Sequence, residues 1–303
     1  MLKLPEKVTI KEVGPRDGLQ NEPHQVGTEN KVAWINRLSD SGLSYIEVTS
    51  LVHPKWIPQL ADAVEVLSSI DRKPGITYAA LVPNMHGLRR ALEGNVDEVS
   101  VFMSASESHN RNNINKSISD TLPVLKEVVT EAKAAGKTVR GYLSTVIACP
   151  YEGAVPAEQV KEISARLFDM GIDELSLGET IGVAVPTEVE RLLEQLLSEF
   201  SEERIAMHFH DTRGTALANI SKALEMGIRT FDSALGGLGG CPYAKGASGN
   251  VATEDLVYML EAMGIKTGVR LEGLIEAGEL MESILGKPLN SRQMELYRKV
   301  ERG

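Results

Sequence analysis

The 303-residue sequence predicts an α/β fold in which eight parallel strands, each followed by a helix, close into a barrel. Short runs rich in β-branched residues alternate with longer amphipathic runs, which is typical of a parallel sheet. Eight such repeats occupy about 260 residues, the length that a closed barrel of this kind requires. A doubly wound open sheet is the alternative, but no dinucleotide-binding fingerprint follows the first strand.

The strand candidates are short apolar runs bounded by turn residues, and their order along the chain defines the repeats. In chain order they are 8–13, 45–50, 76–82, 98–104, 138–147, 174–178, 204–210 and 229–235. We expect the first and the last of these strands to pair, because that pairing closes the barrel.

The helix candidates between the strands are amphipathic, and several of them end in glycine, as helices commonly do. The clearest are 28–42, 119–136, 156–171, 186–200 and 214–227. Thr28 and Ser119 are predicted N-caps. Pro156 and Pro186 suit a first helical turn. Further helices follow from about residue 270. The prediction is therefore one catalytic domain over 1–303, a (β/α)8 TIM barrel with an additional C-terminal helical extension.

Composition excludes several classes of protein. The formal net charge is −10 and no basic run is present, so a nucleic-acid-binding surface is not expected. No apolar run is long enough to span a bilayer, so no membrane partner is expected. The first residues enter a strand pattern at once, which leaves no room for a signal or transit peptide. Two cysteines do not make a disulfide framework. These features indicate a cytoplasmic protein.

The segment HFHDTRG ends the seventh strand and holds the sharpest chemical feature of the sequence. In a strand, side chains at i and i+2 point to the same face, so His208 and His210 project together. In a (β/α)8 barrel the active site lies at the C-terminal ends of the strands. A pair of packed histidines is the alternative, but their position and the following Asp211 favour a metal site.

Two further metal ligands come from strands next to the seventh in a closed barrel. Asp17 follows the first strand, and Asn250 follows the eighth. One carboxylate, two imidazoles and one amide oxygen suit Mg²⁺ or Mn²⁺, although these ligands alone leave zinc open. The alternative for Asn250 is a turn residue, because Gly-Asn is a common turn pair.

Charged residues also stand at the ends of other strands. Arg16, in GPRDGLQNE, is suited to developing negative charge on a substrate oxygen, although Arg-Asp could be a surface ion pair. Glu47 and Glu179 could each be buried carboxylates paired with arginine. Their positions at strand ends favour a functional role, more so for Glu47.

Both cysteines occur in Cys-Pro-Tyr sequences but in different surroundings. Cys149 follows the fifth strand and fits a small buried hydrophobic residue. Cys241 lies in GGLGGCPYAKGASGN, where six glycines predict a mobile loop that closes over substrate. We therefore interpret Cys241 as a proton donor or acceptor.

Five motifs together resemble the 3-hydroxy-3-methylglutaryl-CoA lyase family, in that family's order and over essentially the whole chain. They are GPRDGLQNE (14–22), IEVTS (46–50), RNNIN (111–115), HFHDTRG (208–214) and GGLGGCPYAKGASGN (236–250). The HxH and Arg-Asp elements alone would indicate only the wider metal-dependent aldolase and acyl-CoA condensing superfamily. The glycine-rich segment is much more specific to the lyase.

The resemblance implies a carbon–carbon lyase that cleaves (S)-3-hydroxy-3-methylglutaryl-CoA to acetyl-CoA and acetoacetate, in leucine breakdown or ketone-body formation. It implies Mg²⁺ or Mn²⁺ held by Asp17, His208, His210 and Asn250, Arg16 at the acyl-CoA substrate, and a homodimer. It also implies a catalytic Cys241. LGETIG (177–182) departs from the expected LGDTIG, so that Glu179 is one methylene longer. Without the transit peptide and peroxisomal tail of animal relatives, the chain resembles bacterial, cytoplasmic enzymes.

The chemistry that this activity needs matches the candidate residues. Asp17 or Glu47, directly or through His208, would accept the hydroxyl proton, and Arg16 would stabilise the enolate. Cys241 would protonate the enolate carbon, since a thiol of ordinary pKa, about 8.5, is mostly neutral near pH 7. Two alternatives remain at this point. One is a synthase of the same superfamily that condenses acetyl-CoA with a 2-oxo acid, and the other is a non-catalytic metal-binding barrel.

Overall fold

The centre of the molecule is a closed barrel of eight parallel strands, which confirms the predicted (β/α)8 fold. The structure is a computed structural model that describes residues 4–240 and 249–301. The first strand pairs with both the second and the last, so the sheet has no free edge. The barrel strands are β1 (Thr9–Glu12), β2 (Tyr45–Ser50), β3 (Thr77–Leu81), β4 (Glu98–Ser104), β5 (Thr138–Ser144), β8 (Glu174–Glu179), β9 (Ile205–Phe209) and β10 (Thr230–Ser233).

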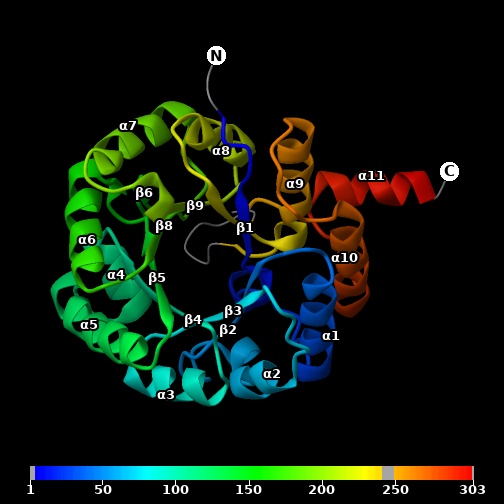
Figure 1. Cartoon of the computed structure of the whole chain (residues 1–303), viewed down its shortest axis with the longest axis horizontal. Coiled ribbons are helices and arrows are strands. Elements are labelled where there is room, and N and C mark those ends of the chain that lie inside the picture. The colour runs from blue at the N-terminus through cyan, green and yellow to red at the C-terminus, as the bar shows by residue number, and fades with distance from the viewer. Residues whose placement is uncertain (1–3, 241–248, 302–303) are drawn as a thin grey trace.

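Helices surround the barrel, as Figure 1 shows in a view close to the barrel axis. Their bounds are α1 (Thr28–Ser39), α2 (Ala63–Ser69), α3 (Met85–Glu93), α4 (Glu107–Ile114), α5 (Ile118–Ala134), α6 (Ala157–Asp169), α7 (Pro186–Leu197), α8 (Ala216–Glu225), α9 (Thr253–Ala262), α10 (Leu271–Leu285) and α11 (Arg292–Glu301). The last two are the predicted C-terminal helices. Among the described helices, none is both long enough and apolar enough to cross a bilayer.

Most of the predicted strands agree with the observed ones to within one residue at each end, but the fifth and the eighth extend two or three residues too far at their C-terminal ends. The fifth ends at Ser144 because Thr145 adopts a left-handed conformation with φ of 62°. The chain then forms a small antiparallel hairpin, β6 (Ala148–Cys149) with β7 (Gly153–Ala154). The eighth ends at Ser233, and the 3-10 turn η4 (Leu235–Gly237) follows it.

Both predicted N-caps are wrong. Gly27 caps α1, and the hydroxyl of Thr28 instead donates to Asp62 Oδ2 at 2.9 Å. Ser117, two residues before the predicted cap, accepts the backbone N–H of Asp120 and begins α5. Tertiary contacts and a competing serine therefore decide these helix starts.

The barrel interior is charged where such barrels are commonly apolar. Lys11 Nζ lies 2.8 Å from Glu174 Oε1, and Arg140 Nε lies 2.6 Å from the same oxygen. On its other side Arg140 Nη2 lies 2.7 Å from Asp232 Oδ1, and the side chains of both are fully buried. Because a buried charge is costly without a partner, these pairs hold one another in fixed positions below the carboxyl ends of the strands.

Candidate active site

The turn that follows β1 presents the first two predicted site residues. Gly14–Gly18 form one wide helical turn, η1, which packs tightly enough that a Cβ at Gly14 would lie 2.5 Å from Glu12 Oε1. Arg16 Nη1 lies 2.5 Å from Asp17 Oδ1, and Arg16 Nε lies 2.5 Å from Glu47 Oε2 on β2. The structure therefore joins Asp17, Arg16 and Glu47 in one buried chain of ion pairs.

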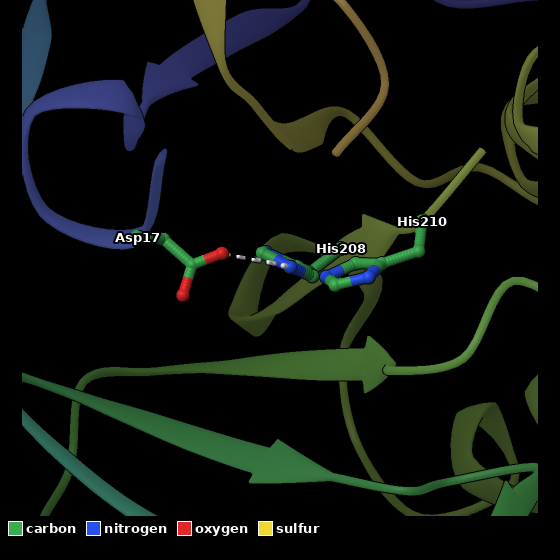
Figure 2. A group of neighbouring side chains, drawn as sticks. All are labelled: Asp17, His208 and His210. Carbon is green, nitrogen blue, oxygen red and sulfur yellow. Dashed lines mark ion pairs between the residues drawn. The ribbon is translucent and has the colours of Figure 1, made fainter. Parts of the chain in front are cut away.

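The two histidines lie beside Asp17 at the end of β9. Their ring centroids are 5.3 Å apart, as expected for side chains on one face of a strand. His208 Nε2 lies 3.9 Å from Asp17 Oδ2, the ion pair drawn in Figure 2, and the ring of His210 lies alongside. Each of Asp17, His208 and His210 offers a ligand atom, and these atoms lie within 4.8 Å of one another.

Asn250 joins this cluster from the segment after β10. Its side-chain Nδ2 donates to Asp17 Oδ2 at 2.9 Å and to the carbonyl of Leu238 at 3.0 Å. Its backbone forms a bridge with His210. The four predicted metal ligands are thus neighbours, although Asp17 and Asn250 are far apart in the chain.

The donor atoms of the cluster fit a divalent cation. His210 Nδ1 and Asn250 Oδ1 are buried, and neither has a hydrogen-bond partner within the described residues. Burial, together with the neighbouring His208, lowers the pKa of His210 to about 4, so its imidazole is neutral near pH 7, as a ligand must be. Burial alone would raise the pKa of Asp17, but the positive charge of Arg16 and then the histidines hold it below its usual value.

A cavity of about 640 Å³ opens over these residues. Arg16, Asp17, His208 and His210 all line it, and so do Asn112 and Asn113 of the RNNIN motif. This volume lies within the range of known small-molecule sites, roughly 300–1,000 Å³. The charged cluster is therefore accessible to a ligand.

The remaining predicted residues lie apart from the cluster or outside the described residues. Glu179 Oε1 accepts the backbone N–H of Val183 at 3.0 Å and so supports the loop after β8. The sulfur of Cys149 is buried in the β6–β7 hairpin and accepts a hydrogen bond from Ser106 Oγ at 2.9 Å. Neither residue lines the cavity. Cys241 lies outside the described residues.

Sequence reasoning missed three buried polar residues that hold members of the site in place. Tyr142 donates to Glu47 Oε2 at 3.2 Å, Arg140 donates to Tyr142, and Asp232 lies 3.2 Å from His208 Nδ1. The sequence did carry a signal for them. Arg140 and Tyr142 are polar residues at alternate positions of β5, and Asp232 is a charged residue within β10. Such residues face the barrel interior and must find partners there.

The buried carboxylate of Glu12 joins the turn after β1 to the segments after β10 and gives a prediction about stability. Glu12 Oε1 accepts the backbone N–H groups of Gly14 and Leu235, and Oε2 accepts the hydroxyl of Thr253. Burial raises the pKa of Glu12 from 4.5 to about 7 despite these hydrogen bonds. Between these two values the folded state binds a proton that the unfolded state has released. The free energy of unfolding should therefore fall as pH rises through this window.

Glu12→Gln should weaken that pH dependence, because an amide does not titrate. We expect the variant to lose less unfolding free energy than the parent between about pH 5 and pH 7, measured by urea unfolding at several pH values. Glu131→Gln, on an exposed part of α5, is the matched control and should follow the parent. Parallel curves for the parent and Glu12→Gln would contradict the prediction.

Known proteins resemble this chain along nearly its whole length. The family model described as HMGL-like matches residues 7–281. A hydroxymethylglutaryl-CoA lyase of Bacillus subtilis is 62% identical over 294 residues, which cover 97% of this chain and 98% of that protein.

Solved structures of HMG-CoA lyases also match this chain along nearly its whole length. The crystal structure of the Bacillus subtilis HMG-CoA lyase superposes with a TM-score of 0.96 at 62% identity, covering 97% of this chain and 99% of that one. An HMG-CoA lyase from Acinetobacter baumannii, solved in complex with coenzyme A and 3-methylmalate, superposes with a TM-score of 0.93 at 40% identity. That match covers 97% of this chain and 96% of the other.

Proposed function

This chain belongs to the HMGL-like family, and on that premise we propose that it is a carbon–carbon lyase that cleaves (S)-3-hydroxy-3-methylglutaryl-CoA to acetyl-CoA and acetoacetate. The observation that carries the proposal is the meeting of Arg16 with the Asp17, His208 and His210 cluster at the wall of one cavity. An acyl-CoA substrate is supported by the relative that was solved with coenzyme A.

Asp17, His208, His210 and Asn250 are the residues that would hold the cation, and their oxygen and imidazole donors favour Mg²⁺ or Mn²⁺. Bound there, a divalent cation supplies Lewis acidity that makes the tertiary hydroxyl of the substrate easier to deprotonate. The low pKa values of Asp17 and His210 keep both side chains in their ligand forms near pH 7.

The cleavage needs a base, a site for negative charge and an acid. The hydroxyl proton leaves to Asp17 or Glu47, directly or through His208, and the oxygen electrons form the ketone of acetoacetate. The C2–C3 bond electrons pass to the thioester carbonyl as an enolate, whose oxygen faces Arg16. Glu47 and Asp17 hold two nitrogens of that guanidinium and so fix its plane. Cys241 then delivers the proton that completes acetyl-CoA.

The proposal also covers the compartment, the oligomeric state and the pathway of the enzyme. We assign the enzyme to the cytoplasm as a homodimer, with no nucleic-acid or membrane partner, in leucine breakdown or ketone-body formation. The net charge of −10 and the absence of a basic run support the exclusion of nucleic acid.

An assay of acetoacetate release tests the activity. The purified protein with Mg²⁺ should release acetoacetate and acetyl-CoA from the hydroxymethylglutaryl thioester in equal amounts. In a parallel reaction, acetyl-CoA with a series of 2-oxo acids should give no condensation product. Condensation without cleavage would replace the lyase with a synthase of the same superfamily.

Arg16→Lys should lower kcat by about 10²-fold or more while KM changes far less. Lysine keeps the positive charge but loses the planar fork, so it cannot hold Glu47 and Asp17 while it faces the enolate. Steady-state kinetics measure the effect. Arg37→Lys, at an exposed ion pair with Glu276, is the control and should leave both constants unchanged. A rise in KM alone would make Arg16 only a substrate-binding residue.

A further inference from the structure

Asp232 is a buried carboxylate that contacts His208 and does not line the cavity. Its Oδ1 accepts Arg140 Nη2 at 2.7 Å. Its Oδ2 accepts Arg140 Nη1 at 3.2 Å and Ser176 Oγ at 2.8 Å, and lies 3.2 Å from His208 Nδ1. Both oxygens therefore act as acceptors, and the charge is balanced by a guanidinium that is itself fully buried.

This arrangement selects one tautomer of His208. A neutral imidazole carries its proton on one nitrogen only, and a carboxylate acceptor beside Nδ1 places it there. The lone pair is then on Nε2, the nitrogen that lies 3.9 Å from Asp17 Oδ2 within the predicted ligand cluster. Carboxylates that orient a ligating histidine in this way commonly determine metal affinity.

Arg140 connects the same carboxylate to the Glu47–Arg16 pair. Its Nη1 also donates to the hydroxyl of Tyr142 at 2.7 Å. With its oxygen accepting from Arg140, Tyr142 directs its own proton to Glu47 Oε2 at 3.2 Å. Glu47 in turn holds Arg16. The Arg140 guanidinium is thus linked to His208 through Asp232. It is linked to Glu47 through Tyr142.

We propose that Asp232 and Arg140 are positioning residues: Asp232 fixes the His208 tautomer that presents Nε2 to the cation, and Arg140 holds Asp232 and, through Tyr142, the Glu47–Arg16 pair. The inference rests on the proposed lyase activity and its divalent cation. Neither residue lines the cavity, so both act through the residues that do.

Asp232→Asn is the decisive variant. Arg140 would attract the amide oxygen, so the amide NH₂ would face Ser176 and His208, and His208 Nδ1 would become the acceptor. The proton would then move to Nε2, as in the known effect of replacing the aspartate of a serine-protease triad. We expect the dissociation constant for Mn²⁺ alone, measured by electron paramagnetic resonance, to rise about 10- to 100-fold. Histidine ¹⁵N NMR should show the reversed tautomer without metal.

Ser176→Ala is the matched control, because it removes a donor to the same oxygen but leaves the carboxylate. It should keep the parental Mn²⁺ affinity and tautomer. A folded Asp232→Asn protein that retains both properties of the parent would overturn the inference. If the parent itself does not bind Mn²⁺, the proposed metal site fails, which is a different result.

Two further variants separate the branches that Arg140 joins. Tyr142→Phe should lower kcat but keep Mn²⁺ affinity, because it breaks only the branch to Glu47. Arg140→Lys should weaken both properties, because an ammonium cannot hold Asp232 and Tyr142 with the same geometry. An Arg140→Lys protein with parental kcat and Mn²⁺ affinity would overturn the role of Arg140. If that variant does not fold, loss of Mn²⁺ affinity in Tyr142→Phe would overturn the separation into two branches.

Discussion

Removal of the divalent cation should abolish acetoacetate release, and added Mg²⁺ or Mn²⁺ should restore it. The reason is the buried polar atoms of the cluster: His210 Nδ1 and Asn250 Oδ1 have no hydrogen-bond partner within residues 4–240 and 249–301. Leaving such groups without partners is costly, and a cation would satisfy the cluster as a whole. The measurement is a coupled acetoacetate assay before and after chelation. Full turnover in excess chelator would contradict the assignment.

Single substitutions should reproduce this loss. Asp17→Ala, His208→Ala and His210→Ala each remove one ligand, so each should weaken Mn²⁺ binding and reduce kcat to near background. His24→Ala is the control, because that histidine is exposed and does not belong to the cluster. It should behave as the parent does in both measurements.

Cys241→Ser should lower kcat by about 10²- to 10⁴-fold, the usual range for loss of a general acid. Serine is nearly isosteric with cysteine but far less acidic, so it cannot deliver a proton to the enolate carbon at a comparable rate. The thiol is not among the proposed ligands, so Mn²⁺ affinity and the unfolding transition should be unchanged. Steady-state kinetics and Mn²⁺ titration together separate a lost acid from a lost metal site.

Cys149→Ser is the natural control, because it changes the same atom in the same Cys-Pro-Tyr context. Cys149 is only 2% exposed, and its sulfur accepts hydrogen bonds from the hydroxyl of Ser106 and from the backbone N–H of Tyr151. The substitution should cost stability at most. Alkylation should modify Cys241 and inactivate the enzyme, and bound substrate should slow both. If Cys149→Ser were inactive and Cys241→Ser normal, the wrong thiol would have been chosen.

The features that the sequence predicts well are those with local periodicity. The spacing of His208 and His210 on one strand already places both imidazoles on one face, and their ring contact confirms that geometry. Strand order also follows once eight repeats indicate a closed barrel, because each right-handed crossover then places the next strand beside the previous one.

The features that could not be predicted depend on residues far apart in the chain. A charged residue such as Asp232 in a barrel strand is expected to face the interior, but its role depends on its pairing with Arg140, 92 positions earlier. Likewise, Thr28 resembles an N-cap until Asp62 is seen to hold its hydroxyl. A buried charge inside a barrel needs an oppositely charged partner, and no local sequence pattern identifies which residue that partner is.

The pairing of β1 with β10 has a consequence for how the chain folds during its synthesis. Asp17 and Asn250 meet across 233 positions, and Glu12 meets Thr253 across 241. Pairing of strands so far apart in sequence is slow, because the entropy of closing the intervening chain opposes it. A nascent chain that has emerged only as far as β9 lacks Asn250 and leaves the edges of β1 and β9 unpaired, which exposes it to aggregation. The four proposed ligands therefore come together only when the barrel has closed. The ribosome must synthesise nearly the whole chain before the complete site can bind a cation.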